Sequence, residues 1–144
     1  MNKAMVMAAD WAFIAGLLEA GNANVFVNSQ HKIFLTFFVD RDRGERLADW
    51  IGGMKGLDGR PLDLNPEIGN SKVSTRIRVR FVGSSAIKVL NKTEERLKDP
   101  VLRKQVDLAT KWWRTVQSRG RKLPSDMIEE REALIAEFKK LKRA

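Results

Sequence analysis

The sequence predicts an α+β domain in which a four-stranded antiparallel sheet carries helices on one face. Segments 23–28, 32–40 and 72–81 alternate apolar and polar residues, as is typical of strands with one buried and one open face. The segments around them repeat apolar residues at helical spacing. The order is helix, two strands, helix, two strands and further helices. We expect 144 residues to form a single domain, residues 1–144.

Composition limits the classes of function. The 27 Lys and Arg residues outnumber the 18 Asp and Glu residues, and the net charge of +9 favours a polyanionic partner, most simply nucleic acid. The absence of cysteine excludes disulfides and thiolate metal sites, and a single histidine excludes a histidine-rich one. No apolar run could span a bilayer, and the first residues lack the apolar core of a signal peptide. We therefore expect an intracellular protein with no membrane partner. An organelle and a bacterial or phage cytoplasm are both open as compartments.

The first predicted helix occupies residues 11–21. Asp10 is expected to cap its start, and Gly21 to end it in the left-handed conformation. Small residues recur every four positions along it: Ala12, Gly16 and Ala20. Such a strip lets another helix approach closely, and the alternative is that it touches the chain's own sheet.

The next elements are a hairpin and a helix. Segments 23–28 and 32–40 are predicted to pair, with His31 in the turn. A charged turn at 40–44 is expected to lead into a helix at 45–54. A short strand is then predicted at 61–65 and a loop at 65–71, since that stretch holds proline, glycine and asparagine.

Segment 72–81 has the clearest alternation in the chain. One face is apolar, and the other consists of Lys72, Ser74, Arg76, Arg78 and Arg80. Four cations on one face of a strand repel one another, which lowers stability unless an anion lies across them. We interpret this face as a binding surface rather than a merely solvated one.

The C-terminal part is predicted to be helical. Residues 84–98 should form one or two short helices, and Pro100 suits the first turn of the next. The apolar stripe of that helix is expected to be Leu102, Val106, Ala109, Trp113 and Val116. A basic break follows at 118–123, and Ser125 is expected to cap a last helix. Trp50, Trp112 and Trp113 are expected in the core because they follow helical stripes.

Residues 14–22 (IAGLLEAGN) resemble the nine-residue signature of the LAGLIDADG homing-endonuclease family. The first five positions and the seventh fit, and Glu19 is a conservative replacement at the sixth. The eighth position, where the family carries its metal-binding acid, is Gly21, and the ninth, normally glycine, is Asn22. Residues 35–43 and 102–108 also resemble corresponding parts of the family, and the predicted order resembles its αββαββα domain with trailing helices.

The resemblance implies partners. Family members with one motif per chain are homodimers whose signature helices pack at a two-fold axis, and whose sheets form a saddle in the DNA major groove. For this chain, the implied dimer interface is Ala12, Ala15, Gly16, Glu19 and Ala20.

The resemblance also implies a chemistry that this sequence has altered. Cleavage in the family needs one carboxylate per subunit to hold a divalent metal between the scissile phosphates. Gly21 supplies none, and Arg41 stands where a water-ordering glutamine is common, so we expect no cofactor and lost or impaired cleavage. The alternative is an active Mg²⁺-dependent endonuclease that uses another residue. The candidates are Glu19, Asn22, Asp40 and Asp42, although helical geometry directs Glu19 away from position 21.

Candidate nucleic-acid contacts lie on the open face and at the end of the hairpin. The cations are Lys32, Arg41, Arg43, Lys72, Arg76, Arg78 and Arg80; the neutral hydrogen-bonding residues are Asn24, Asn28, Thr36 and Ser74; the aromatic residues are Phe26, Phe34 and Phe38. The aromatic residues fit a duplex-reading sheet less well. They either pack under a neighbouring segment, form a protein interface, or stack on unpaired bases. Stacking would favour structured RNA, and the further alternative is an RNA-binding structural protein of a large ribonucleoprotein such as an organellar ribosome.

Overall fold

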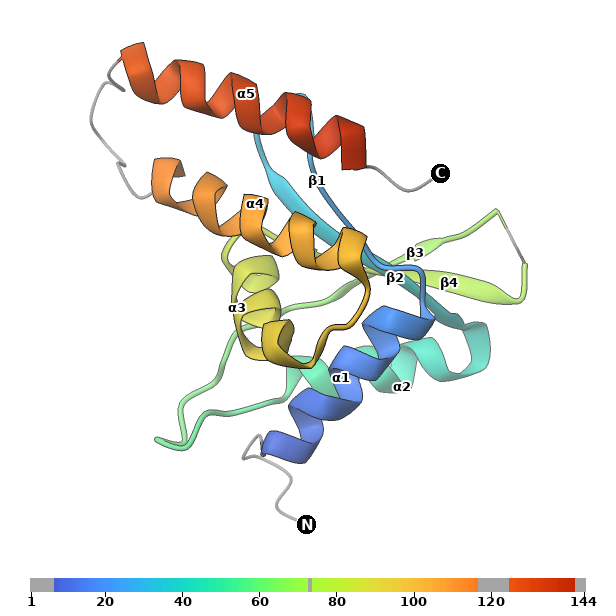
Figure 1. Ribbon diagram of the computed structural model, residues 1–144. Helices are drawn as coiled ribbons and strands as arrows, with labels where there is room; N and C mark the ends of the chain where they lie inside the picture. The colour runs from blue at the N-terminus through green and yellow to red at the C-terminus, as the bar shows by residue number, and fades with distance from the viewer. Residues whose placement is uncertain (1–6, 73, 117–124, 142–144) are drawn as a thin grey trace.

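The chain folds into one antiparallel sheet with helices packed against it (Figure 1). This computed structural model describes residues 7–72, 74–116 and 125–141, with the side chains of residues 125 and 126 left out. The elements are α1 (Ala8–Ala20), β1 (Asn24–Val27), β2 (Ile33–Asp40), α2 (Arg41–Gly52), β3 (Glu67–Asn70), β4 (Arg76–Val82), α3 (Ser84–Thr93), the 3-10 helix η1 (Glu94–Arg96), α4 (Pro100–Val116) and α5 (Ser125–Leu141). The predicted α+β class and four-stranded antiparallel sheet are confirmed.

The strands lie in the order β1-β2-β4-β3, and every neighbouring pair is antiparallel. The register places Thr36 of β2 between Asn24 of β1 and Arg80 of β4, and places Arg80 opposite Glu67 of β3. Because side chains alternate along a strand, these four residues share one face of the sheet.

The opposite face of the sheet supports the core. Val25, Leu35, Phe37, Val79 and Phe81 are fully buried there against residues of α1, α3 and α4. Of the three tryptophans expected in the core, Trp112 is buried, whereas Trp50 and Trp113 are half-buried and pack against the core. Adjacent residues on a helix face different directions, so Trp112 and Trp113 could not both be fully buried on one face.

The two ends of α1 differ from the prediction. The helix begins at Ala8, and Asp10 lies in its first turn, where the carboxylate accepts the Met7 N–H at 2.8 Å. Gly21 follows the helix with φ −92°, and Asn22 adopts the left-handed conformation instead, with φ 54°. The predicted left-handed Gly21 is therefore wrong.

Helix α2 begins at Arg41, so the predicted charged turn at 40–44 is the first turn of the helix. Asp42 in this turn complements the positive end of the helix dipole. Gly44 is buried, and a Cβ there would lie 1.8 Å from the Ile77 side chain. This glycine lets α2 lie directly on β4.

The third strand is β3, in the predicted loop, and not 61–65. That earlier segment makes one isolated bridge, Lys55–Pro61, because Asp63 and Asn65 both have positive φ. The fourth strand begins at Arg76 rather than at residue 72. Lys72 and Ser74 therefore lie in the β3–β4 connection, in which residue 73 is not described. The predicted break at 118–123 also lies outside the described residues.

The outer edge of β1 is closed by a buried glutamine of α4. Gln105 is fully buried, and its Oε1 accepts the Val25 N–H at 3.0 Å. Its Nε2 donates to Asn24 Oδ1 at 2.8 Å and to the Leu141 carbonyl at 3.0 Å, which joins β1 to α4 and α5. None of the helices in the described ranges is long and apolar enough to cross a membrane.

Candidate nucleic-acid interface

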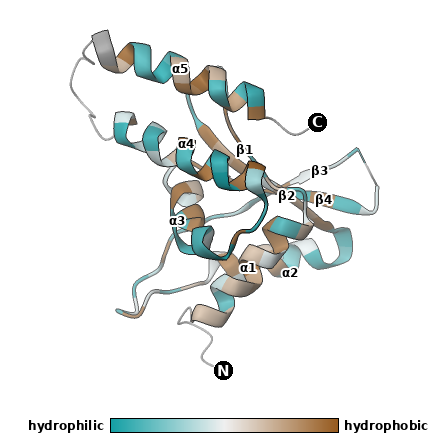
Figure 2. Cartoon of the chain, in the orientation of Figure 1, coloured by the Kyte–Doolittle hydropathy of each residue, from teal (hydrophilic) through white to brown (hydrophobic). Residues whose placement is uncertain are grey.

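The face of the sheet opposite the core divides into an aromatic part and a cationic part. The aromatic part lies where β1, β2 and β4 pair through Phe26, Phe34 and Val82. The cationic part lies at the other end of β4, around Arg76 and Arg78. In Figure 2 the end of β4 next to the β3–β4 connection is hydrophilic.

The aromatic part is covered by its own side chains. Phe26 and Phe34 stack with their centroids 5.3 Å apart, and the Arg80 guanidinium lies 5.0 Å from the Phe34 centroid. Phe34 is consequently only 8% exposed. With the Phe26 ring and the Arg80 guanidinium against it, Phe34 offers little surface on which a base could stack.

Arg80 is also paired with a carboxylate. Its Nη2 lies 3.0 Å from Glu67 Oε1, and its Nε donates to the same oxygen at 3.2 Å. Glu67 is its cross-strand neighbour, which the sequence analysis missed because it placed residues 65–71 in a loop. One of the four predicted cations is therefore held by an acid.

The other three cations surround a hollow next to the end of α1. A volume of about 530 Å³ is lined by Asn22, Phe38, Asn70, Ser71, Lys72, Arg76 and Arg78. The lining contains no carboxylate, and none of the three cations forms an ion pair with a described residue. Asn70 was not predicted as a site residue, because the segment that carries it has no alternating pattern.

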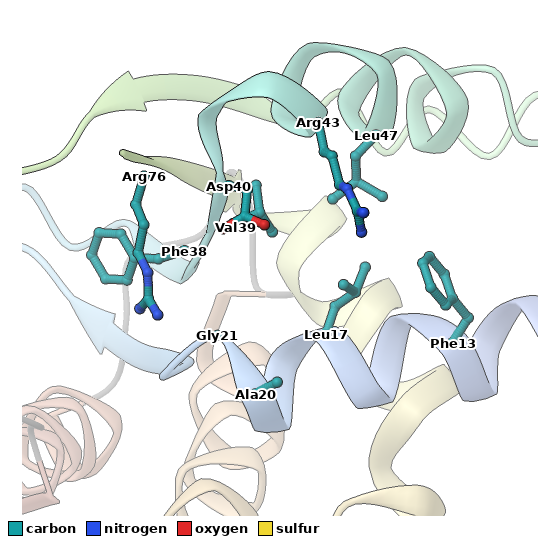
Figure 3. A pocket seen from close by; sticks show the side chains of 10 residues that line it. All are labelled: Phe13, Leu17, Ala20, Gly21, Phe38, Val39, Asp40, Arg43, Leu47 and Arg76. Atoms are coloured by element: carbon teal, nitrogen blue, oxygen red, sulfur yellow. The ribbon is translucent and has the colours of Figure 1, made fainter. Parts of the chain in front are cut away.

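A second hollow, of about 340 Å³, lies between α1, α2 and the end of β2 (Figure 3). Figure 3 shows Arg43 from α2 and Arg76 from β4 directed toward α1 from two sides. Asp40 is the only carboxylate in the lining, and no group of three or more acidic or histidine side chains in the described segments could hold a metal ion. Two guanidinium groups and one carboxylate favour an anion here over a divalent cation.

Position 21 leaves no room for a side chain. A Cβ on Gly21 would lie 2.7 Å from the carbonyl oxygens of both Leu17 and Phe38. The Phe38 N–H donates to the Gly21 carbonyl at 2.8 Å, so the backbone of β2 lies directly against the end of α1. An acid at this position would require the backbone itself to move.

The alternative catalytic residues are dispersed. Glu19 Oε1 accepts the backbone N–H groups of Lys98 and Asp99, which ties α1 to the loop before α4. Asp40 and Asp42 are exposed at the junction of β2 and α2, and Asn22 is exposed at the rim of the 530 Å³ hollow. These side chains do not converge on one site.

Arg41 has a structural role that the sequence analysis missed. Its Nε donates to the Ser74 carbonyl at 2.7 Å, and its Nη2 donates to the Arg76 carbonyl at 3.4 Å. Its backbone N–H donates to the Thr75 carbonyl at 2.9 Å. Arg41 therefore fixes the start of β4, and its side-chain donors are bound to the carbonyls of Ser74 and Arg76.

Several predicted contact residues are occupied within the chain. Asn28 Oδ1 accepts the N–H groups of Gln30 and Lys32 and so stabilises the hairpin turn, where His31 has φ 61° as a turn residue. Asn24 binds Gln105, and Thr36 is buried. The side chains that the structure leaves accessible are Phe26, Lys32, Phe38, Arg43, Lys72, Ser74, Arg76 and Arg78.

The small residues of α1 lie on an exposed side of the helix. Ala12, Gly16 and Ala20 are exposed, and Phe13 beside them is 54% exposed. Ala15 is 2% exposed and belongs to the chain's own core, so its predicted place in a dimer interface is wrong.

The structure resembles solved homing endonucleases. The homing endonuclease I-CvuI in complex with its target in 2 mM Ca has a TM-score of 0.67 and 16% identity, over 95% of this chain and 84% of that chain. I-CvuI in complex with the target of I-CreI in 2 mM Mg, where the DNA is not cleaved, has a TM-score of 0.61 and 15% identity, over 94% and 83%. No protein-family model and no curated protein matches the sequence. The chain therefore has the LAGLIDADG homing-endonuclease fold, as the signature at residues 14–22 predicted.

Proposed function

We propose that this protein binds an extended duplex-DNA site through the open face of its sheet and no longer cleaves it. The observation that carries the proposal is the group formed by Lys72, Arg76 and Arg78, none of which forms an ion pair with a described residue. Cations kept together without an acid favour binding of a polyphosphate, which releases its condensed counterions when the protein neutralises it.

Two further observations support duplex DNA as the partner. The net charge of +9 favours association with nucleic acid over the whole surface. The two similar structures described above are both of I-CvuI in complex with a DNA target. Structured RNA has less support, because base stacking needs an accessible ring, and Phe34 is only 8% exposed while Phe26 and Phe38 are half-buried.

The surroundings of Gly21 support the loss of cleavage. Metal-assisted phosphodiester hydrolysis needs carboxylates to anchor the ion, and Gly21 has neither a side chain nor space for one. The charged side chains that line the two hollows at this helix end are Arg43, Lys72, Arg76, Arg78 and Asp40, and the excess of cations raises the electrostatic free energy of a bound metal. Retained binding without cutting suits a protein derived from a homing endonuclease.

The exposed strip on α1 supports a homodimer. Ala12, Gly16 and Ala20 present almost no side chain, so a second copy of α1 could approach to backbone distance. Two sheets would then cover two halves of one site.

Selection of bound sequences from a mixed pool of duplex DNA and structured RNA tests the partner. We expect one duplex sequence family to be enriched, and enrichment of structured RNA would contradict the proposal. A plasmid carrying the selected site should remain uncut after incubation with the protein and Mg²⁺. Site-specific double-strand breaks that disappear in Glu19→Gln would overturn the non-cleaving interpretation.

A further inference from the structure

Arg78 is seated on a glycine of the neighbouring strand. A Cβ built on Gly69 would lie 2.7 Å from Nη2 and 3.3 Å from both Nε and Cζ of Arg78, so the guanidinium lies over the bare backbone of β3. Gly69 does not have a positive φ, and its backbone conformation is open to other residues. The absence of a side chain at Gly69 therefore leaves the space that the Arg78 guanidinium occupies.

The Arg78 side chain lacks polar partners among the described residues. Its Nε is buried and has no hydrogen-bond partner, and the guanidinium has no ion pair among the described residues. Phe38 is its cross-strand neighbour on β2, opposite Gly69 on β3. Because Nε is buried, an acceptor from outside the chain would bind the terminal nitrogens of this unpaired charge.

The hollow in front of Arg78 concentrates positive charge. Lys72 enters it from the β3–β4 connection, Arg76 and Arg78 from alternate positions of β4, and the neutral Asn22 from the end of α1. Three positive charges around one hollow repel one another, although Lys72 and Arg76 are exposed and solvent screens part of the repulsion. A negatively charged occupant relieves the remainder.

We propose that this hollow is a dedicated site for one backbone phosphate of the bound duplex, with Arg78 held in its binding position by Gly69. The proposal rests on the DNA-binding function proposed above and assigns a role to one part of that surface. A phosphate is favoured over a base edge because base edges in the major groove are uncharged, whereas the hollow carries three cations and no acid. The planar guanidinium can donate two parallel hydrogen bonds to phosphate oxygens.

The test changes Arg78, which carries the charge, and Gly69, over which the guanidinium lies, in separate variants. Arg78→Ala should weaken binding to a mixed-sequence duplex on the order of tenfold and lower the slope of log affinity against log salt by about 0.9. Gly69→Ala keeps every charge but displaces the guanidinium, and it should also weaken binding. In the Arg78→Ala background, Gly69→Ala should have no further effect, because the group that it displaces is gone.

Arg114→Ala on the exposed side of α4 is the matched control, since it removes the same charge away from the sheet. It should leave affinity and salt slope nearly unchanged. Thermal melting of each variant checks folding, and Gly69→Ala should fold because its new methyl group meets the end of a flexible side chain.

Neutral methylphosphonate linkages, placed one at a time along the duplex, identify the phosphate. One position in each half of the site should weaken binding of the unchanged protein but not of Arg78→Ala. If the unchanged protein does not bind duplex DNA, the proposed function fails. If it binds, but Arg78→Ala keeps the salt slope and instead relaxes one base in the selected site, Arg78 reads a base and the phosphate site is refuted.

Discussion

At the residue scale, the structure shows why position 21 must be glycine. The Phe38 N–H of β2 donates a hydrogen bond to the Gly21 carbonyl, and the β2 backbone occupies the space where a side chain would begin. Glycine is required here by close approach, while the left-handed conformation belongs to Asn22.

Restoring an acid at position 21 should not restore a metal site. We expect Gly21→Asp to lower the free energy of unfolding by roughly 1–3 kcal/mol, the usual cost of overpacking, because its Cβ meets two carbonyl oxygens. Urea unfolding with and without Mg²⁺ measures this change. Gly52→Ala is the control, since its Cβ would make an ordinary contact 3.8 Å from Pro66. A Gly21→Asp protein that Mg²⁺ stabilises, and that cuts DNA, would contradict the expectation.

The missing acid could be read directly from the sequence, but the lack of space for it could not. That lack depends on Phe38, which is distant in the sequence and reaches Gly21 only after the hairpin folds onto α1. The same holds for Arg80, whose partner Glu67 is brought opposite by strand pairing. Contacts between separate elements determine the space at position 21 and the pairing of Arg80, and the local sequence pattern carries no information about such contacts.

At the scale of elements, α1 presents a side that no described residue covers. A Cβ on Gly16 would have no atom outside its own helix within 4 Å, although glycine in an exposed helix interior is unfavourable by about 1 kcal/mol relative to alanine. A small residue retained at that cost is consistent with a second helix that approaches closely.

Gly16→Val should convert a dimer into monomers, because the branched side chain separates the two helices. The monomer has space for it, so the fold should survive. Light scattering measures the mass, and circular dichroism confirms the helices. Ala133→Val, at an exposed position of α5, is the control and should leave the mass unchanged. An unaltered dimer in Gly16→Val would place the interface elsewhere.

Elements with one buried face were predictable, and the others were not. The hairpin strands β1 and β2 lie within the predicted segments because alternation follows directly from burial of one face. Strand β3 is largely exposed on both sides and so has no alternation to detect. Helix α2 begins in a run of charges that suits either a turn or the first turn of a helix.

At the scale of the whole molecule, positive charge is distributed unequally along β4. Arg76 and Arg78 have no acidic partner among the described residues, whereas Arg80 shares its charge with Glu67. The row that the sequence presents as uniform is therefore two open cations and one neutralised pair. Replacing Arg76, Arg78 and Arg80 together with alanine should weaken DNA binding and flatten its salt dependence by up to about 0.9 for each phosphate that the protein no longer neutralises.

Single substitutions should distinguish the contributions of Arg76, Arg78 and Arg80 to DNA binding. Arg76→Ala and Arg78→Ala should each lower the salt slope more than Arg80→Ala does. Glu67→Gln should raise affinity, because it releases Arg80 from its ion pair. Fluorescence anisotropy of a labelled duplex across a salt series measures these changes. Equal slopes for all the arginine variants would show that the pairing with Glu67 does not persist in the complex.

Gln105 has a consequence for how copies of this protein can associate. A strand from another molecule can extend a sheet only where backbone donors at the edge are free, and on the β1 side the Val25 donor is already taken by a buried side chain of the same chain. Growth into a ribbon of joined sheets is thereby blocked at that edge. The other edge of the sheet is β3, and pairing there would join two copies and stop, because neither copy has a second open edge from which the sheet could continue.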